Sequence, residues 1–318
     1  MTAYIIRRLI QAVVVLIVVS LLVFFAMRLL PGDPILMYLS REQFDTLTVE
    51  QIERARHELG LDRSLAVQYT AWMGGLFHGD FGTSLFYREN VGELLAQRLP
   101  VTLHLGLISF VIANTLGIFA GIISALRRGT ILDTLVTIAA NIGITLPIFW
   151  LGILLIYLFS IKLHWLPVFG YTSPFEDFWL NTKQLIMPVI CLSIFTIAAT
   201  ARQTRSSMLE VVQQDYIRTA WAKGLKERSV VFKHILKNSL IPVVTLIGMH
   251  LGNIIGGSVL IETVFNIPGM GILAVDALFN LDYIVVQAIA LLVATMVVLV
   301  NLVVDISYCW LDPRIRFG

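Results

Sequence analysis

Side chains that bind metal ions or perform covalent chemistry occur in this chain, but they are not grouped. Its six histidines show no ligand spacing, and the sequence has no His-Glu-x-x-His segment and no paired cysteines at metal-binding distance. No glycine is followed by lysine, so the core of a phosphate-binding loop is absent, as is Gly-x-Ser-x-Gly. Cys191 and Cys309 fall in or beside apolar segments and are interpreted as packing residues. We therefore expect no catalytic residue, no metal site and no directly bound cofactor.

The most informative segment is a basic insert between two long apolar segments, roughly residues 202–237. Apolar or small residues at its centre follow the i, i+3, i+4, i+7 spacing of one helical face. They are Ile217, Ala220, Trp221 and Gly224. This spacing predicts a short helix outside the membrane with one apolar face, which a membrane protein needs where a soluble protein must bind it.

Residue types indicate where this helix begins and ends. Asp215 is placed to cap its start, and Gly224 is placed to end it in a left-handed turn. The alternative is a helix on the membrane surface whose basic side chains reach toward the headgroups. The residues assigned to the surface helix are Asp215, Tyr216, Ile217, Arg218, Ala220, Trp221, Lys223 and Gly224.

The composition indicates a membrane protein. Hydrophobic residues make up 57% of the 318 residues, charged residues only 14%, and the mean hydropathy is +0.83. A soluble domain of this length needs more charge to cover its surface. Six apolar runs without Asp, Glu, Lys or Arg reach about the 20 residues that cross a bilayer. They are Leu9–Met27, Leu99–Leu126, Thr134–Ile161, Gln184–Ala201, Asn238–Ile261 and Tyr283–Val304.

Positive charge predicts the orientation, because short cytoplasmic loops carry excess Lys and Arg. Of the 23 basic residues, 14 share one side if both termini are cytoplasmic. They are Arg7, Arg8, Arg127, Arg128, Arg202, Arg205, Arg218, Lys223, Lys226, Arg228, Lys233, Lys237, Arg314 and Arg316. We predict an all-α polytopic membrane protein with six transmembrane helices, both termini cytoplasmic, surrounded by lipid and without a nucleic-acid partner.

The chain divides into three parts. Residues 1–30 form the N-terminus and an uncleaved first span, since the apolar run is longer than that of a signal peptide. Residues 31–98 form an extracytoplasmic helical lid, and residues 99–318 form a five-helix transmembrane core with the insert 202–237. Within the lid, we expect short helices that start near Thr48 and Asn90 and a third at Ser64–Phe77. The alternative is a helical spacer with no role of its own.

Small and polar residues inside the spans suggest packing and pathway positions. Gly248, Gly252 and Gly256 have the four-residue spacing of a face on which another helix packs closely. The same span holds polar side chains that could border a pathway. The candidate pathway-lining residues are Asn141, Thr145, His250 and Asn253.

Nine short segments form a recognisable series along nearly the whole chain. They are Tyr4–Leu9, Leu30–Pro34, Leu59–Asp62, Gly79–Ser84, Arg98–Leu103, Tyr216–Gly224, Asn238–Pro242, Pro268–Gly269 and Leu311–Arg314. This series resembles the first, B-type permease subunit of the dipeptide/oligopeptide/nickel family of ABC importers. The insert resembles that family's cytoplasmic coupling segment, the EAA loop. Arg218 and Thr219 stand where the general pattern has Glu and Ala, and Lys237 stands where it has Pro.

The resemblance implies a type I ABC importer permease fold in a bacterial or archaeal cytoplasmic (inner) membrane. It implies a non-catalytic transport subunit that works with a homologous second permease, two cytoplasmic ATP-binding subunits and an extracytoplasmic substrate-binding protein. ATP and Mg²⁺ would be used by the ATP-binding subunits. It also implies that the 215–224 helix binds an ATPase groove, with Tyr216, Ile217 and Trp221 as apolar anchors. The lid and the segment Pro268–Asn280 are then candidate surfaces for the binding protein.

Several alternatives stay open. Short peptides are favoured as substrate, but the same architecture imports nickel chelates or glutathione in the family that the chain resembles. An ATP-independent carrier or channel is a more distant alternative, since the spans carry no buried acid or base and show no inverted repeat. A membrane receptor or assembly protein whose insert binds a signalling partner is the third class.

Overall fold

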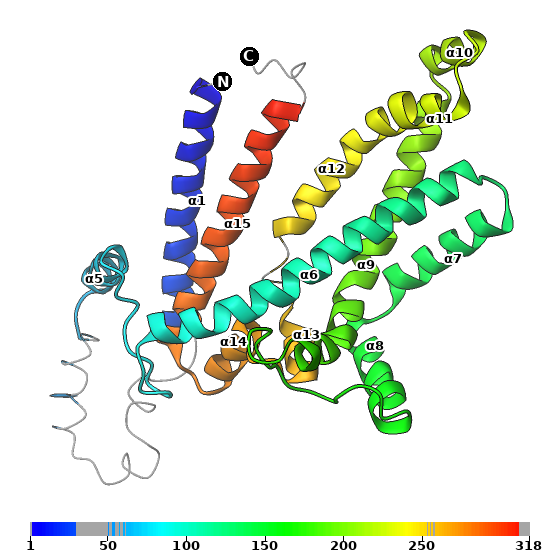
Figure 1. Ribbon diagram of the computed structural model, residues 1–318. Helices are drawn as coiled ribbons and strands as arrows, with labels where there is room; N and C mark the ends of the chain where they lie inside the picture. Colours follow the sequence, from blue (N-terminus) through cyan, green and yellow to red (C-terminus); the bar gives the residue numbers. More distant parts are fainter. Residues whose placement is uncertain are drawn as a thin grey trace. The chain divides into compact units, whose positions relative to one another are not determined.

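The computed structural model describes residues 2–29, 62–252 and 258–311, together with residues 50, 53, 54, 57, 60, 254 and 256 (Figure 1). All regular secondary structure in these residues is helical, apart from one isolated backbone bridge between Thr83 and Asn90. The long helices are α1 (Thr2–Leu29), α6 (Val91–Leu126), α9 (Phe178–Val212), α12 (Lys237–Gly252) and α15 (Tyr283–Leu311). The shorter ones are α5 (Leu65–Phe77), α7 (Ile131–Thr145), α8 (Ile148–Leu155), α10 (Asp215–Ala222), α11 (Glu227–Ser229), α13 (Val259–Phe265) and α14 (Met270–Phe279), with π-helical turns η1 (Ile156–Lys162) and η2 (Val230–Leu236).

The predicted fold class, an all-helical polytopic membrane protein, is confirmed. Five helices within the described residues are long and apolar enough to cross a membrane, or up to seven spans if each of two bent pairs counts as one. One of these pairs is the predicted third span, which breaks by 104° between α7 and α8. The break falls at Leu146, whose extended backbone is favoured by the following Pro147. The count of six spans and the side of the termini stay predictions.

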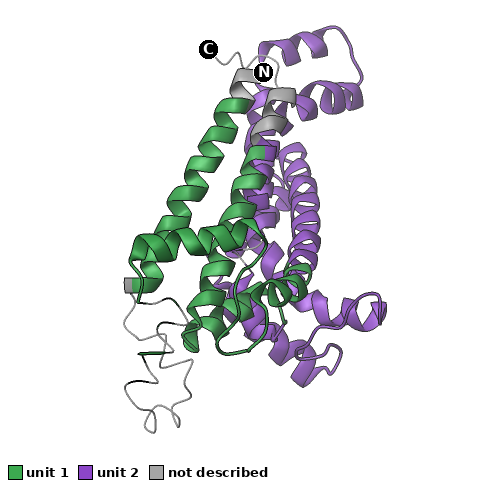
Figure 2. Ribbon diagram, turned by 90° about the vertical axis from the view of Figure 1, so that its left-hand side faces the viewer, with its two compact units in different colours: residues 1–102, 268–302 green, residues 103–267, 303–318 purple. Residues whose placement is uncertain are grey.

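The chain forms two compact units (Figure 2). Unit 1 comprises residues 1–102 and 268–302, and unit 2 comprises residues 103–267 and 303–318. The core of unit 1 lies between the start of α6, α14 and the start of α15, where Val91, Leu94, Met270 and Val285 are nearly inaccessible. The hydroxyl of Thr102 accepts a hydrogen bond from the Met270 amide at 2.8 Å and joins α6 to α14.

A buried carboxylate fixes the loop before α6 in unit 1. Asp282 is fully buried and accepts hydrogen bonds from the Ser84 hydroxyl at 2.5 Å and the Phe86 amide at 3.1 Å. The expected short helix at Asn90 is not a separate element. It forms the first turns of α6, which begins at Val91 and continues for 36 residues through the predicted second span. The helix expected from Thr48 lies largely outside the described residues, whereas the one at Ser64–Phe77 is confirmed as α5.

In unit 2, close helix packing uses glycines that the sequence pattern did not single out. A Cβ on Gly117 of α6 would lie 2.7 Å from Cβ of Thr200 on α9. The expected face of Gly248, Gly252 and Gly256 is not continuous, because α12 ends at Gly252. A Cβ on Gly256 would meet nothing within 4 Å in this chain. The residues that let α6 approach α9 are therefore Gly117 and Gly121.

We predict that Gly121→Ala destabilises unit 2. The new Cβ would lie 2.5 Å from Cβ of Thr204 and 2.6 Å from the Ala201 carbonyl oxygen, so α6 and α9 must separate. Overpacking of this kind costs ~1–3 kcal/mol. Gly74→Ala in α5 is the matched control, since its Cβ would have open space. Thermal unfolding of the purified complex should show a lower midpoint for Gly121→Ala alone; equal midpoints for both variants would contradict the prediction.

Candidate functional site

The predicted surface helix is present as α10, which begins at Asp215 and ends at Ala222. Gly224 has φ +72 and follows the C-cap Lys223, so its predicted left-handed conformation is confirmed. The predicted cap at Asp215 is wrong, because Gln214 is the N-cap and has no side-chain capping bond. Asp215 lies in the first turn instead, where a carboxylate interacts favourably with the exposed amides of the helix start.

Some apolar residues of α10 are buried within unit 2, and others are exposed. Ile217 is fully buried and Ala220 is 6% exposed, in a cluster with Met208, Val230 and Ile235. Tyr216 and Trp221 are each 44% exposed. The expectation that Ile217 contacts a partner is therefore wrong, because its side chain is covered by α9 and η2 of its own chain. Tyr216 and Trp221 remain the apolar side chains that a partner can contact.

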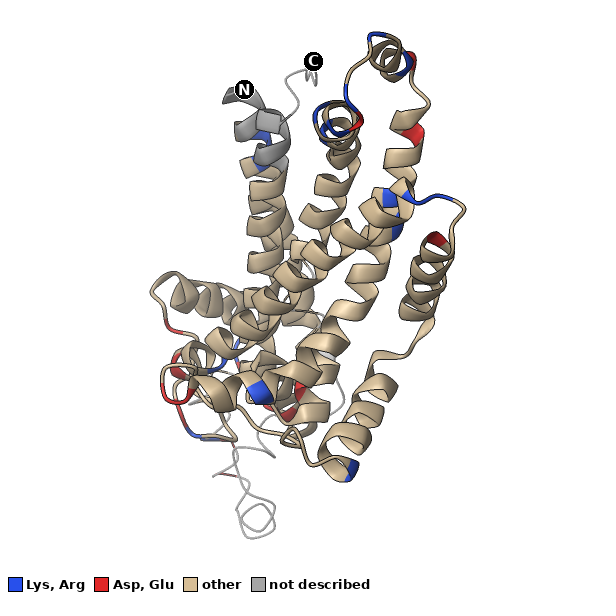
Figure 3. Ribbon diagram, turned by 45° about the vertical axis from the view of Figure 1, so that its right-hand side comes forward, with Lys and Arg blue, Asp and Glu red and all other residues tan. Residues whose placement is uncertain are grey.

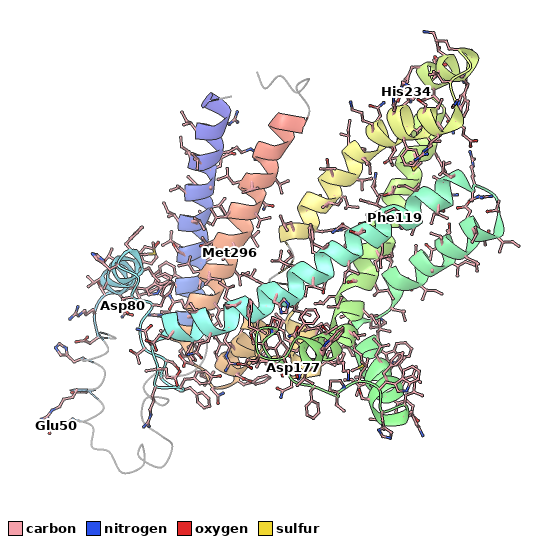
Figure 4. All side chains as sticks on the ribbon, viewed as in Figure 1. Glu50, Asp80, Phe119, Asp177, His234 and Met296 are labelled. Atoms are coloured by element: carbon pink, nitrogen blue, oxygen red, sulfur yellow. The ribbon has the colours of Figure 1, made fainter. Side chains whose placement is uncertain are left out.

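Exposed polar side chains surround these two aromatic residues. Arg218 and Lys223 are exposed, and Arg218 lies 3.5 Å from Asp215 in an exposed pair that contributes little. The Tyr216 hydroxyl accepts a hydrogen bond from the Asn238 amide at 3.0 Å, which joins α10 to the start of α12. Basic residues gather at this end of unit 2, in the α6–α7 loop and around α10 and α11 (Figure 3). Figure 4 shows the side chains at the same end, with His234 labelled.

An ion pair joins α7 to α9, about two turns before the end of α9. The Arg205 guanidinium donates two hydrogen bonds to Asp133, at 2.7 Å and 2.9 Å. The Ser124 hydroxyl and the Gly129 amide donate to the same carboxylate at 2.5 Å and 3.0 Å. Asp133 is 6% exposed, so α6, α7 and α9 meet at one buried carboxylate. In the sequence, Arg205 is one of the basic residues of the insert, and the signal for its partner is Asp133, an acidic residue at the edge of an apolar segment.

A cavity of about 570 Å³ lies in unit 2 between α6, the α7–α8 break, α9 and the end of α12. It is lined by Gly106, Ser109, Phe110, Leu146, Ile148, Leu192, Phe195, Thr196, His250, Ile254 and Gly256. None of these side chains carries a formal charge when the histidine is neutral. The Nδ1 atom of His250 is buried and has no hydrogen-bond partner among the described residues.

The four predicted pathway residues are placed differently. His250 lines the cavity, whereas Asn141 and Thr145 are exposed residues of α7 that do not line it. The Thr145 hydroxyl donates to the Asn141 carbonyl at 3.1 Å, within its own helix. Asn253 lies outside the described residues. Ser109 and Thr196 line the cavity but are not among the predicted residues, because small hydroxyl residues in an apolar helix usually bond their own backbone, as Ser109 does to Leu105.

Comparison with known proteins identifies the family. Residues 117–317 match the family described as the inner membrane component of binding-protein-dependent transport systems, and residues 1–106 match its N-terminal region. The chain belongs to this family. It is a multi-pass permease of the bacterial inner membrane.

Curated relatives are similar over the full length of the chain. It is 41% identical over 317 residues to a probable peptide ABC transporter permease of Sinorhizobium fredii, covering 100% of both chains. It is 43% identical over 320 residues to a putative peptide transport system permease of Brucella abortus, again with 100% of both covered. It is 42% identical over 336 residues to a di/tripeptide transport system permease of Pseudomonas aeruginosa, with 99% of each covered.

Solved structures confirm the fold. An inward-facing form of the MetNI methionine ABC transporter matches with a TM-score of 0.54 at 19% identity, covering 69% of this chain and 96% of that one. A structure of an amino acid ABC transporter with histidines matches with a TM-score of 0.54 at 14% identity, covering 69% and 94%. At these identities the similarity concerns the fold of the permease.

Proposed function

We propose that this chain is one permease subunit of an ATP-driven importer of short peptides. The observation that carries the proposal is the similarity of 41–43% over the full length to permeases described as belonging to peptide transport systems. The chain would form half of a translocation pathway, with a homologous second permease forming the other half. A substrate-binding protein would deliver di- and oligopeptides from outside, and two cytoplasmic subunits would bind and hydrolyse ATP with Mg²⁺.

The surface of α10 supports the assignment of the ATPase contact. Half-exposed aromatic side chains beside exposed basic ones are typical of the centre and rim of a protein interface. Tyr216 and Trp221 would enter a groove of the ATP-binding subunit, with Arg218 and Lys223 at the rim. This subunit would then have no catalytic role, and ATP hydrolysis would belong to its partners.

Two helices are placed to carry movement of α10 to the cavity. α9 contacts α10 through Met208, and sixteen residues away its Leu192 lines the cavity. α12 is bonded to α10 through Asn238, and its His250 lies at the cavity. A rigid displacement of α10 by the ATPase would therefore reach both cavity walls. Alternating access requires two such states with different contacts to each ligand.

The lining of the cavity suits a substrate without a fixed overall charge. A peptide in transit presents amide donors and acceptors and variable side chains. Apolar walls with the hydroxyl residues Ser109 and Thr196 would accept such a molecule without selecting one side chain. The external binding protein would therefore set most of the specificity.

The substrate can be tested by stimulation of ATP hydrolysis. The chain, its neighbouring permease, the ATP-binding subunits and the binding protein are reconstituted in lipid, and di- and tripeptides, glutathione and a nickel chelate are added in turn. We expect di- and tripeptides to give the largest stimulation. A response to glutathione or the nickel chelate alone would retain the architecture and overturn the peptide assignment.

A further inference from the structure

The helix α5 of unit 1 is apolar on all sides but is not buried by protein. Its 13 residues, Leu65–Phe77, include no charged side chain, and none of them is buried. Leu65, Val67 and Phe77 are 47%, 45% and 83% exposed. A helix that is hydrophobic all round is stable in a protein core or in a membrane, whereas a helix that covers a protein in water has a polar face.

The Thr70 hydroxyl and the Gln68 amide of α5 have hydrogen-bond partners within the chain. The Thr70 hydroxyl donates to the Ala66 carbonyl at 3.0 Å, within the helix. Gln68 donates from its amide nitrogen to the Arg63 carbonyl at 2.9 Å, and its oxygen accepts from the Arg28 guanidinium at 3.3 Å. Each of these side chains has an internal partner, which is the condition that a helix in hydrocarbon must meet.

Contacts with Ser20 and Phe24 show where along the length of α1 the helix α5 packs. The Tyr69 hydroxyl is 2.8 Å from Ser20 Oγ, which donates its own hydrogen to the Ile17 carbonyl, so Tyr69 is the donor. The rings of Tyr69 and Trp72 pack on Phe24, whose side chain is fully buried. Ser20 lies eight residues before Arg28, which at 1.5 Å per residue is roughly 12 Å along the axis from that end of the apolar span.

We infer that α5 lies within the membrane, in the leaflet at the C-terminal end of α1, with lipid covering its exposed face. Its Tyr69 reaches a serine inside an apolar segment of 23 residues, Ile6–Arg28, that is long enough to span the bilayer. Leu22 of α1 and Val67 of α5 are 64% and 45% exposed, each on the side of its helix that faces away from the contact between Ser20 and Tyr69. A helix of 13 residues is too short to cross the roughly 30 Å hydrocarbon core, so α5 lies along the leaflet. This part of the predicted lid is thus a membrane element rather than a cover in water.

Spin-label accessibility in the assembled complex tests this inference. In a Cys191→Ser, Cys309→Ser background, a nitroxide is attached at Val67→Cys in lipid nanodiscs. Val14→Cys in the middle of α1 is the lipid reference, since Val14 is 53% exposed, and Glu89→Cys in the exposed loop before α6 is the water reference. We expect the oxygen-to-nickel-chelate accessibility ratio at Val67 to be several-fold above that at Glu89 and close to that at Val14.

A second label and a functional measurement keep the outcome interpretable. Ala71→Cys, one turn further along the exposed face, should give the same ratio as Val67→Cys. Ratios at both positions equal to that at Glu89 would overturn the membrane placement of α5. Peptide-stimulated ATP hydrolysis by each labelled complex is measured separately, so a wrong substrate assignment is distinguished from a wrong placement of α5.

Discussion

Replacing Trp221 by alanine is expected to abolish most of the peptide-stimulated ATP hydrolysis of the complex while leaving the chain folded. Trp221 is 44% exposed and contributes little to the core of its own unit. If it anchors the ATPase subunit, its loss costs about 2 kcal/mol or more, which corresponds to a weakening of assembly by about 30-fold. Binding of the ATP-binding subunits and stimulated hydrolysis should fall together, with the unfolding temperature within a few degrees of the original.

The matched variant is Ile217→Ala in the same helix. Ile217 is fully buried among Met208, Val230 and Ile235, so its truncation leaves a cavity and costs about 2–4 kcal/mol of stability. We expect this variant to lower the unfolding temperature clearly. If Trp221→Ala lowered the unfolding temperature as much as Ile217→Ala and kept full stimulation, the assignment of α10 to the ATPase contact would be wrong.

The second large loss of stability is expected when the ion pair between Asp133 and Arg205 is broken. Asp133→Ala removes the acceptor of four hydrogen bonds and leaves the Arg205 guanidinium without its partner. Breaking a buried pair costs about 3–5 kcal/mol, and partial exposure of Arg205, 32% of its side chain, reduces this to about 2–3 kcal/mol. Thermal unfolding of the complex measures the loss, and proteolysis within residues 202–237 should become faster as α9 loosens.

Ser124→Ala is the control for this site. It removes one hydrogen bond to Asp133 and leaves the ion pair intact, so it should cost only about 1 kcal/mol. A double variant, Asp133→Ala with Arg205→Met, should recover part of the loss because it leaves no unpaired charge. Equal losses for the single and double variants would mean that Asp133 and Arg205 do not depend on each other.

The position of the surface helix and the all-helical membrane fold could be predicted from the sequence. Spacing and residue types predict a helix within residues 215–224 that ends at Gly224 in a left-handed turn, and α10 spans Asp215–Ala222 with Gly224 in that conformation. Spacing could not decide which part of the apolar face is covered by the chain itself. Ile217 and Trp221 are four residues apart on one face, yet the first packs against η2, more than a dozen residues further on, and the second is exposed. That difference depends on tertiary contacts.

Most features that could not be predicted depend on residues far apart in the sequence. Asp133 and Arg205 are separated by 72 residues, and Ser84 and Asp282 by 198, so no local pattern connects them. The bend at Leu146 could have been predicted from Pro147, which follows directly. The apolar composition is continuous across the bend, and it favours one unbroken span. The helix α5 is predicted from the sequence, whereas its contact with α1 joins Tyr69 and Ser20, which are 49 residues apart.

Movement of a labelled tripeptide across the membrane of proteoliposomes that contain the complete complex tests the central claim most directly. The ATP-binding subunits face the outside medium, where ATP is added, and the binding protein is enclosed in the lumen. The tripeptide starts at equal concentration on both sides, so import is measured as transfer from the lumen to the outside. We predict that ATP lowers the luminal concentration of the tripeptide below the outside concentration, and that a non-hydrolysable ATP analogue does not. Concentrations that stay equal with ATP, together with exchange of the label that is independent of ATP, would contradict an ATP-driven permease and favour a carrier or channel.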